Sequence, residues 1–397
     1  GPGLARIAAF MGFDGVESFG AALLGHLQTV EGHYARLFED APELASGGGN
    51  LVFTGGETDP ETRHTLGGMG FGNPEAVAET IRGWHHGRVR ATRSTRAREL
   101  LTELTPALLG ALSRTAAPDD AFLRFDTFLS RLPAGVPLFS LFHANPSLLD
   151  LVAEIMGDAA ALAEHLGRHP SLLDSVLSAG FFAPPPPCAT LTAELDRVLA
   201  EADDFQQVLD LARRWANDRK FQVGVLTLRA LVGAAEAAAA LSDVAEAVLA
   251  TLGRRVEDEF ARAHGRVPGG AWVVLAMGKA GGREMSATSD LDLILVYDAP
   301  EGAEESDGPR PLATPLWFAR LTQRLVNALS AKTGEGTLYE VDMRLRPSGH
   351  SGPVASSLAA FSRYQAEAAW TWEHMALTRA RVVGGDPALA PPVVAVV

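Results

Sequence analysis

Two hydrophobic patterns divide the chain. Up to about residue 252, apolar residues recur every three or four positions, as they do in the set Phe122, Phe125, Leu129 and Leu132. This spacing predicts amphipathic helices, and the Ala, Leu, Glu and Arg residues that dominate this region are good helix formers. Beyond residue 270, the pattern changes to short apolar runs, at 271–277 and 293–297, that predict buried strands.

Polar residues of a particular kind lie between these two apolar runs. Gly281 and Gly282 are followed, after six residues, by Ser289, Asp290, Leu291, Asp292 and Leu293. Successive side chains on a strand point to opposite faces, so Asp290 and Asp292 should share one face while the two leucines enter the core. Two carboxylates on one face suit a divalent metal ion, and a glycine pair lets the backbone approach a phosphate. The combination predicts chemistry on a nucleoside triphosphate.

A third strand is predicted over residues 339–347, where apolar and polar residues alternate. Val341, Met343 and Leu345 would form one face, and the other would carry Glu340, Asp342, Arg344 and Arg346. Beside the preceding strand, Asp342 would complete a set of three aspartates for two metal ions, and the arginines would bind phosphate oxygens. A helix is predicted before this strand by the spacing of Trp317, Leu321, Leu325 and Leu329.

Several of these residues have a second interpretation. Arg344 and Arg346 could neutralise the acidic cluster rather than hold a triphosphate. Lys279 could contact phosphate or remain a solvent-exposed residue, and Ser289 could donate to phosphate or only shape a turn. Another group is predicted to pack on a helix face: Trp370, Trp372 and Glu373.

Charge and composition exclude some classes of partner and favour one cellular location. The net charge is −14, which argues against a nucleic acid as partner because its phosphates would be repelled. One cysteine, Cys188, excludes an internal disulfide and favours a reducing cytoplasm. The chain has no apolar run near ~20 residues and no secretory signal, so we expect a cytoplasmic protein that does not contact a membrane.

The motifs resemble those of a known superfamily. The segments that carry the resemblance are GKAGGRE at 278–284, SDLDLI at 289–294, VDMRLRPSG at 341–349 and WTWEH at 370–374. They are similar to the nucleotidyltransferases of DNA polymerase beta type and, within them, to the glutamine synthetase adenylyltransferase family. The resemblance implies that Asp290, Asp292 and Asp342 are catalytic and bind Mg²⁺, and that ATP lies over Gly281 and Gly282.

The resemblance also implies an activity. The family adds AMP to glutamine synthetase and removes it, using two similar halves, and the motifs here are more similar to the second, adenylylating half. We therefore expect transfer of AMP from ATP to a tyrosine of glutamine synthetase by a two-metal mechanism, with release of pyrophosphate. The alternatives are phosphorolytic deadenylylation and a regulatory interaction module with a silent site. Regulation by the PII signal protein and by glutamine is implied by the resemblance alone.

The expected architecture is α+β, with a large all-helical N-terminal region followed by a small mixed-sheet nucleotidyltransferase domain. We place a helical regulatory or connector region at 1–256 and the catalytic domain at 257–397. The last residues, 389–397, complete no recognisable element. Because the family continues beyond this point, we expect the chain to be an internal fragment whose catalytic domain is truncated at its C-terminal side.

Overall fold

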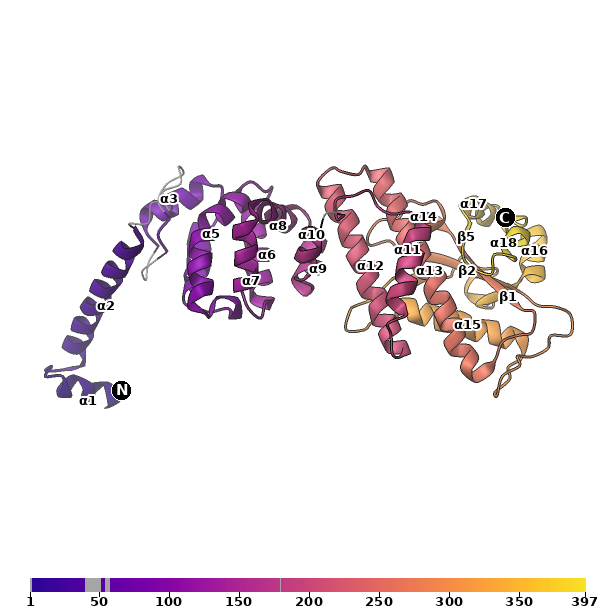
Figure 1. Ribbon diagram of the computed structural model, residues 1–397, viewed down its shortest axis with the longest axis horizontal. Coiled ribbons are helices and arrows are strands. Elements are labelled where there is room, and N and C mark those ends of the chain that lie inside the picture. Colours follow the sequence, from indigo (N-terminus) through magenta and orange to yellow (C-terminus); the bar gives the residue numbers. More distant parts are fainter. Residues whose placement is uncertain (1, 40–50, 54–57, 179) are drawn as a thin grey trace. The chain divides into compact units, whose positions relative to one another are not determined.

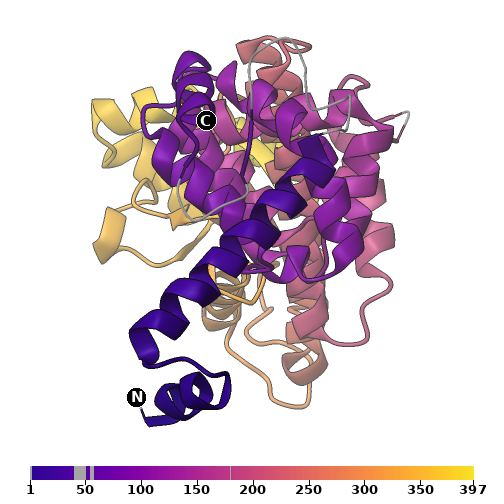
Figure 2. The same cartoon turned by 90° about the vertical axis from the view of Figure 1, so that its left-hand side faces the viewer.

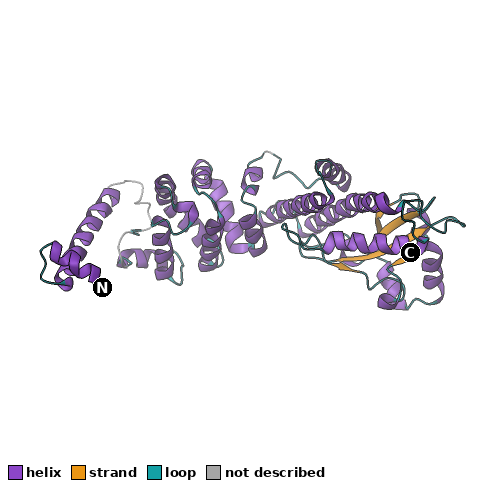
Figure 3. Cartoon of the chain, turned by 90° about the horizontal axis from the view of Figure 1, so that it is seen from below, coloured by secondary structure: helices purple, strands orange, loops and turns teal. Residues whose placement is uncertain are grey.

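The computed structural model describes residues 2–39, 51–53, 58–178 and 180–397. It forms two compact units, Gly1–Leu173 and Asp174–Val397, which are described separately. Helices make up most of the described residues, and the strands belong to the second unit, as Figure 3 shows in orange. The predicted α+β class, with helices first and a small sheet later, is confirmed.

The first unit is helical. Figure 2 shows α2 as a long indigo helix with the short α1 at one end. In α6, the predicted helix face is buried, and the ring of Phe122 stacks on Trp84 of α4 with 5.3 Å between ring centroids. The helices are α1 Pro2–Phe10, α2 Val16–Glu39, α3 Pro60–Gly68, α4 Pro74–His85, α5 Thr95–Ser113, α6 Pro118–Arg131, α7 Val136–Ala144, α8 Pro146–Asp158 and α9 Ala160–Arg168, with a 3-10 turn at Arg90–Thr92.

Among the described residues, no single helix has the length and apolar character to cross a membrane. Helices α7 and α8 meet that test only as a pair, and the chain bends by 113° between them.

The second unit begins with helices and continues into the sheet (Figure 1). Its helices are α10 Leu172–Val176, which crosses the division between the units, α11 Cys188–Leu199, α12 Phe205–Leu228, α13 Ala234–His264, α14 Gly278–Gly281, α15 Thr314–Ser330, α16 Leu358–Glu367, α17 Thr371–Leu377 and α18 Ala390–Val394. Its strands are β1 Ala271–Ala276, β2 Leu291–Asp298, β3 Val341–Asp342, β4 Ala355–Ser357 and β5 Arg381–Gly385, with a 3-10 turn at Gly349–Ser351.

Two positions bear on the predicted limits of the catalytic domain. Residues 256 and 257 lie inside α13, which ends at His264 and is followed by Gly265, and the chain changes from helix to strand only between His264 and Ala271. Gly265 has a φ of +68°, a conformation that favours glycine at a helix end. At the other end of the domain, residues 389–397 do contain an element, the short helix α18, which we had not expected.

The sheet is mixed, with strand order β3-β2-β1-β5. β1 runs antiparallel to both β2 and β5. On its other edge β2 has two parallel neighbours, because β3 pairs with its first residues and β4 with its last. β2 is therefore the central strand, and the residues at its start lie between β1 and β3.

Both faces of the sheet are buried, which explains why its strands are continuous apolar runs. One face carries Trp272, Val274, Leu293 and Leu295 and packs against helices that include α13 and α15. In α15 the predicted positions are confirmed as core residues: Trp317, Leu321, Leu325 and Leu329. The opposite face carries Val273, Leu275, Ile294 and Val296 and packs against α16, α17 and α18.

The predicted strand over 339–347 is wrong beyond Asp342. Only Val341 and Asp342 pair with β2, and the chain then turns. The carboxylate of Asp342 accepts a hydrogen bond from the backbone N–H of Arg344 at 2.7 Å, a local bond that favours a turn over a strand. A second turn follows, in which the N–H of Arg346 donates to the carbonyl of Met343. Alternating polarity therefore located this strand but gave neither its start, which is two residues later than predicted, nor its end.

Candidate active site

Three aspartates meet at the start of β2. Asp290 and Asp292 are adjacent to Asp342, and one carboxylate oxygen from each lies within 4.8 Å of the others. The register of the sheet produces this arrangement, because Asp292 is the direct partner of Asp342 in the parallel β2–β3 pair. The N–H of Leu291 donates to the carbonyl of Glu340 at 2.9 Å and fixes that register.

At Asp292, burial and repulsion between carboxylates outweigh the attraction of the nearby cations. Burial raises the pKa of the Asp292 carboxyl, and repulsion from Asp290 and Asp342 raises it further. Arg344 and Lys279 act in the opposite direction but do not reverse the shift. A bound cation would relieve this repulsion, and carboxylate oxygens are the ligands that Mg²⁺ prefers. The donor set therefore fits a divalent metal ion.

Arg344 is at the cluster, as its side chain contacts Asp342. Its Nη2 and Nε lie 2.5 Å and 2.6 Å from one carboxylate oxygen of Asp342. This hydrogen bond raises the pKa of the Arg344 guanidinium above its ordinary value. The side chain is otherwise exposed, so it can also meet a ligand from solvent.

Arg346 binds backbone carbonyls rather than an aspartate of the cluster. Its side chain is buried, with Nη1 donating to the carbonyl of Met343 at 2.7 Å and a longer contact, 3.4 Å, from Nε to the carbonyl of Gly352. The prediction that Arg344 and Arg346 share one face assumed a strand through residue 347, whereas β3 ends at Asp342. In the observed turn, Arg346 braces the backbone, so its position gives no support to a phosphate contact.

The predicted phosphate-binding glycines lie in α14 and at its C-terminal end rather than in an open loop. A Cβ on Gly281 would come within 2.0 Å of the carbonyl of Arg379, so close packing of the protein's own backbone requires glycine there. Gly282 has no such restriction, since its nearest contacts are at 3.4 Å. Lys279 is exposed on the same short helix, near enough to Asp292 to affect its pKa.

Ser289 lies directly before the aspartates and is buried. Its hydroxyl accepts a hydrogen bond from the N–H of Ser286 at 2.9 Å and lies 2.9 Å from the hydroxyl of the same residue. These contacts close the turn that leads into β2. The position of Ser289 is therefore that of a turn residue, one of the two interpretations left open by its sequence.

Gly278 is a site residue that the sequence reasoning missed. Its φ is +53°, and a Cβ there would lie 2.3 Å from a carboxylate oxygen of Asp292. Only glycine combines this conformation with such a close approach. The available signal was a glycine directly after the apolar run that ends at Met277.

The loop after α14 is fixed to α13 by ion pairs that the sequence did not reveal. Arg283, whose φ of +59° is unusual for a residue other than glycine, makes two hydrogen bonds to Asp243, of 2.7 Å and 2.9 Å. Arg381 pairs with Glu246 and also donates to the carbonyl of Ala280 at 3.2 Å. These contacts hold the backbone between Gly278 and Asp290 against the long helix.

Cys188 lies beside the same two carboxylates, and the group Cys188, Asp243 and Glu246 has the spacing of a metal site. Both carboxylates already have arginine partners. Burial raises the pKa of the Cys188 thiol, with a further rise from Glu246, so the reactive thiolate is disfavoured. The group therefore belongs to the set of contacts that fix the loop after α14 to α13.

The tryptophan pair near the C-terminus differs from expectation. Trp370 and Trp372 are exposed, at 70% and 55%, rather than packed on a helix face. Glu373 does pack: it is buried and accepts hydrogen bonds from the hydroxyl of Tyr364 at 2.9 Å and from the N–H of Trp370 at 2.8 Å. Spacing alone could not separate the buried from the exposed members of this group.

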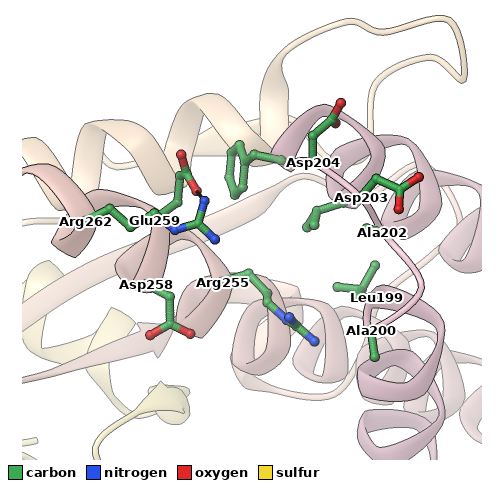
Figure 4. Close-up of a pocket in the computed structure, with 11 residues that line it drawn as sticks. Leu199, Ala200, Ala202, Asp203, Asp204, Arg255, Asp258, Glu259 and Arg262 are labelled. Carbon is green, nitrogen blue, oxygen red and sulfur yellow. Dashed lines mark ion pairs between the residues drawn. The ribbon is translucent and has the colours of Figure 1, made fainter.

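A small cavity of about 180 Å³ lies elsewhere in the second unit. Figure 4 shows that α13 supplies Arg255, Glu259 and Arg262 to it, while the turn between α11 and α12 supplies Asp203 and Asp204. Glu259 pairs with Arg262 at 2.7 Å, and Asp204 caps α12. None of the aspartates of the cluster lines this cavity.

A small mixed sheet that presents three aspartates beside a glycine-led helical turn is typical of a nucleotidyltransferase. Comparison with protein families agrees: the model of the glutamate-ammonia ligase adenylyltransferase family matches residues 149–392. The chain belongs to this family.

Curated relatives extend the match over almost the whole chain. A protein of Mesorhizobium japonicum is 49% identical over 391 residues, which are 98% of this chain and 40% of that protein. Proteins of Brucella melitensis and Rhizobium meliloti are 50% and 47% identical, over 97% and 98% of this chain and 39% of each relative. All three are named bifunctional glutamine synthetase adenylyltransferase/adenylyl-removing enzyme. The chain thus spans about two fifths of the length of these relatives.

Proposed function

We propose that this chain carries an adenylyl-transfer site of its family and transfers AMP from ATP to a tyrosine of glutamine synthetase. The observation that supports this most strongly is the meeting of Asp290, Asp292 and Asp342 in a chain of this family. The tyrosine oxygen would form the new bond to the α-phosphorus, and the bond from that phosphorus to the bridging oxygen would break. Pyrophosphate is then the leaving group.

The three aspartates would hold two Mg²⁺ ions. When bound, Mg²⁺ supplies charge neutralisation and helps a tyrosine hydroxyl, whose reference pKa is about 10, to react at neutral pH. The protein's own groups have separate tasks in this proposal. Asp342 would take the phenolic proton, and Lys279 and Arg344 would neutralise the triphosphate.

Arg344 would move in this process. Without ligands, it neutralises Asp342. When a cation replaces its charge at Asp342, its exposed guanidinium is free to bind the leaving pyrophosphate, for which its planar donors are well suited.

Deadenylylation is the second candidate, because the relatives are named for both reactions. Phosphorolysis attacks the same phosphorus of a tyrosine-linked AMP, so one set of carboxylates can serve either direction. The similarity of the motifs to the adenylylating half of the family favours transfer. A third candidate, an interaction module with a silent site, would bind neither Mg²⁺ nor ATP.

A side-by-side assay separates these candidates. The chain is incubated with α-labelled ATP, Mg²⁺ and unmodified glutamine synthetase in one reaction, and with adenylylated glutamine synthetase and orthophosphate in the other. We expect labelled glutamine synthetase and pyrophosphate in the first reaction. ADP formed only in the second reaction would assign the site to deadenylylation. Binding of neither Mg²⁺ nor ATP would support the interaction module with a silent site.

The proposal has three further parts, of which the effectors depend on resemblance alone. We place the chain in the cytoplasm, assign residues 1–256 a regulatory or connecting role, and expect the PII signal protein and glutamine to act as effectors.

A further inference from the structure

The segment between α15 and β3, residues 331–340, is held by side chains of α12. Arg213, Arg214 and Lys220 all reach it, although they precede it by more than 100 residues. Arg214 makes the most exposed contact, an ion pair of 2.7 Å with Glu335. The other two contacts are more enclosed and lie seven residues apart, which places them on the same side of the helix.

Arg213 is fully buried, and the four hydrogen bonds it donates all go to backbone carbonyls. Its Nη2 donates to Ala328 at 2.8 Å and Ala331 at 2.6 Å, and its Nε to Gly336 at 3.0 Å. Ala328 and Ala331 lie at the C-terminal end of α15, where carbonyls lack partners within the helix and favour a cation. Desolvation lowers the pKa of Arg213, so burying this cation has a cost that these bonds offset.

Lys220 holds the part of the segment nearest to the aspartates. Its ammonium donates to the carbonyl of Leu338 at 3.0 Å and lies 3.7 Å from the centroid of the Tyr339 ring. The Tyr339 hydroxyl is buried and has no hydrogen-bond partner among the described residues. Tyr339 is therefore held through its ring and through its N–H, which donates to Leu329 at 3.2 Å.

These contacts are important because β3 is very short. Its two residues pair only with the start of β2, and the chain turns immediately after Asp342. Strands in folded proteins average about five or six residues, so a pair of two residues contributes little to holding a side chain in place. Only Glu340 and Val341 separate the Tyr339 anchor from Asp342.

We propose that Arg213 and Lys220 are positioning residues for Asp342, and that α12, through them, sets the place of the third carboxylate of the metal site. Neither residue touches a reacting atom. The catalytic consequence depends on the proposed function, whereas the effects on metal binding and on the order of the segment do not.

The test compares variants of the complete chain. Lys220→Met removes the ammonium and keeps a long apolar side chain, and Lys220→Arg restores a cation and a donor. Arg254→Met is the control, because Arg254 pairs with Asp196 on the exposed side of α13, away from the segment. The measurements are Mn²⁺ affinity and amide hydrogen exchange of residues 331–342.

We expect Lys220→Met to weaken Mn²⁺ binding about tenfold and to speed exchange in 331–342, as loss of a group behind a metal ligand does. Lys220→Arg should recover most of both effects, and Arg254→Met should change neither. Mn²⁺ affinity within twofold of the wild type in Lys220→Met would overturn the proposal. If that variant does not fold, amide hydrogen exchange of the wild type decides. The amides of residues 331–342 should become exchangeable at the same denaturant concentration as those of α12. Exchange of the two regions at different concentrations would overturn the proposal.

Failure of the proposed function gives a different result. If the wild type transfers no AMP but Lys220→Met still loses Mn²⁺ affinity, the positioning role holds and the reaction assignment is wrong. If the wild type is active and Lys220→Met keeps the wild-type Mg²⁺ requirement, the positioning role is wrong.

Discussion

β2 and β3 contribute to the same cluster of carboxylates, but they are supported in different ways. β2 has eight residues, lies in the middle of the sheet and is covered on both faces, so Asp292 stands on a rigid strand. β3 has two residues and lies at the edge. The chain before Asp342 is also held by contacts from α12, more than 100 residues earlier in the sequence.

The comparison shows that a metal site can combine one part built by local sheet structure with another built by distant side chains. The first part should tolerate changes in the surrounding helices, and the second should not. Changes in β2 and changes in the contacts to β3 therefore test the account separately.

The largest effect is expected at β2 itself. Asp290→Asn or Asp292→Asn should each lower AMP transfer by at least about 100-fold, because an amide is a poor ligand for Mg²⁺ and cannot replace the charge. Asp298→Asn is the matched control, since Asp298 is the exposed last residue of the same strand. Rates measured at saturating ATP and Mg²⁺ would contradict the assignment if either cluster variant kept the activity of the control.

AMP transfer should be nearly as sensitive to a change in the backbone beside β2. Gly278→Ala places a Cβ against Asp292 at a positive φ, which costs about 1–2 kcal/mol in strain and displaces the carboxylate. We expect activity to fall about 10- to 100-fold. Gly110→Ala is the control, because Gly110 lies in α5 and a Cβ there would meet nothing closer than 3.9 Å, so its activity should stay within about twofold of the wild type. Equal losses in the two variants would show that the approach of Gly278 to Asp292 has no special role.

Loss of the contacts that α12 makes with the segment before β3 should lower the stability of the protein. Arg213→Met leaves the carbonyls of Ala328, Ala331 and Gly336 without this donor, and we expect the free energy of unfolding to fall by about 3–5 kcal/mol. Arg254→Met removes an exposed ion pair and should cost less than about 1 kcal/mol. Urea unfolding of both variants is the measurement, and similar losses would mean that Arg213 is not a central support.

The difference between the strands also explains what could be predicted from sequence. Asp292 lies in a long apolar strand and Asp290 directly before it, and because alternation there is a local property, their shared face was predictable. Arg346 was assigned to the face of Arg344 because polar and apolar residues continue to alternate after β3 has ended. The turn formed by the side chain of Asp342 has no periodic pattern in the sequence that would mark it. The contacts of Arg213 and Lys220 could not be predicted, since they depend on how α12 packs against a segment far away in sequence.

The smallest effect is expected in the metal-free protein. The pKa of Asp292 is raised in the folded state, so between its unfolded value of about 3.8 and its folded value the folded protein holds more protons, and stability falls as pH rises through that window. At pH 7, Asp292→Asn should therefore stabilise the metal-free chain slightly, and it should abolish the rise in melting temperature that we expect Mg²⁺ to produce in the wild type. Thermal unfolding with and without Mg²⁺ tests both points; destabilisation of the metal-free variant would contradict the repulsion described here.

One measurement tests most directly whether both strands build a single transfer site: the transfer of labelled AMP from ATP to glutamine synthetase by the wild type and by Asp342→Asn. We predict that the wild type labels a tyrosine and releases an equal amount of pyrophosphate, and that Asp342→Asn loses at least about 100-fold in rate, as expected for a carboxylate that binds metal. Undiminished labelling by Asp342→Asn would contradict the account, because the short strand would then contribute nothing to the reaction.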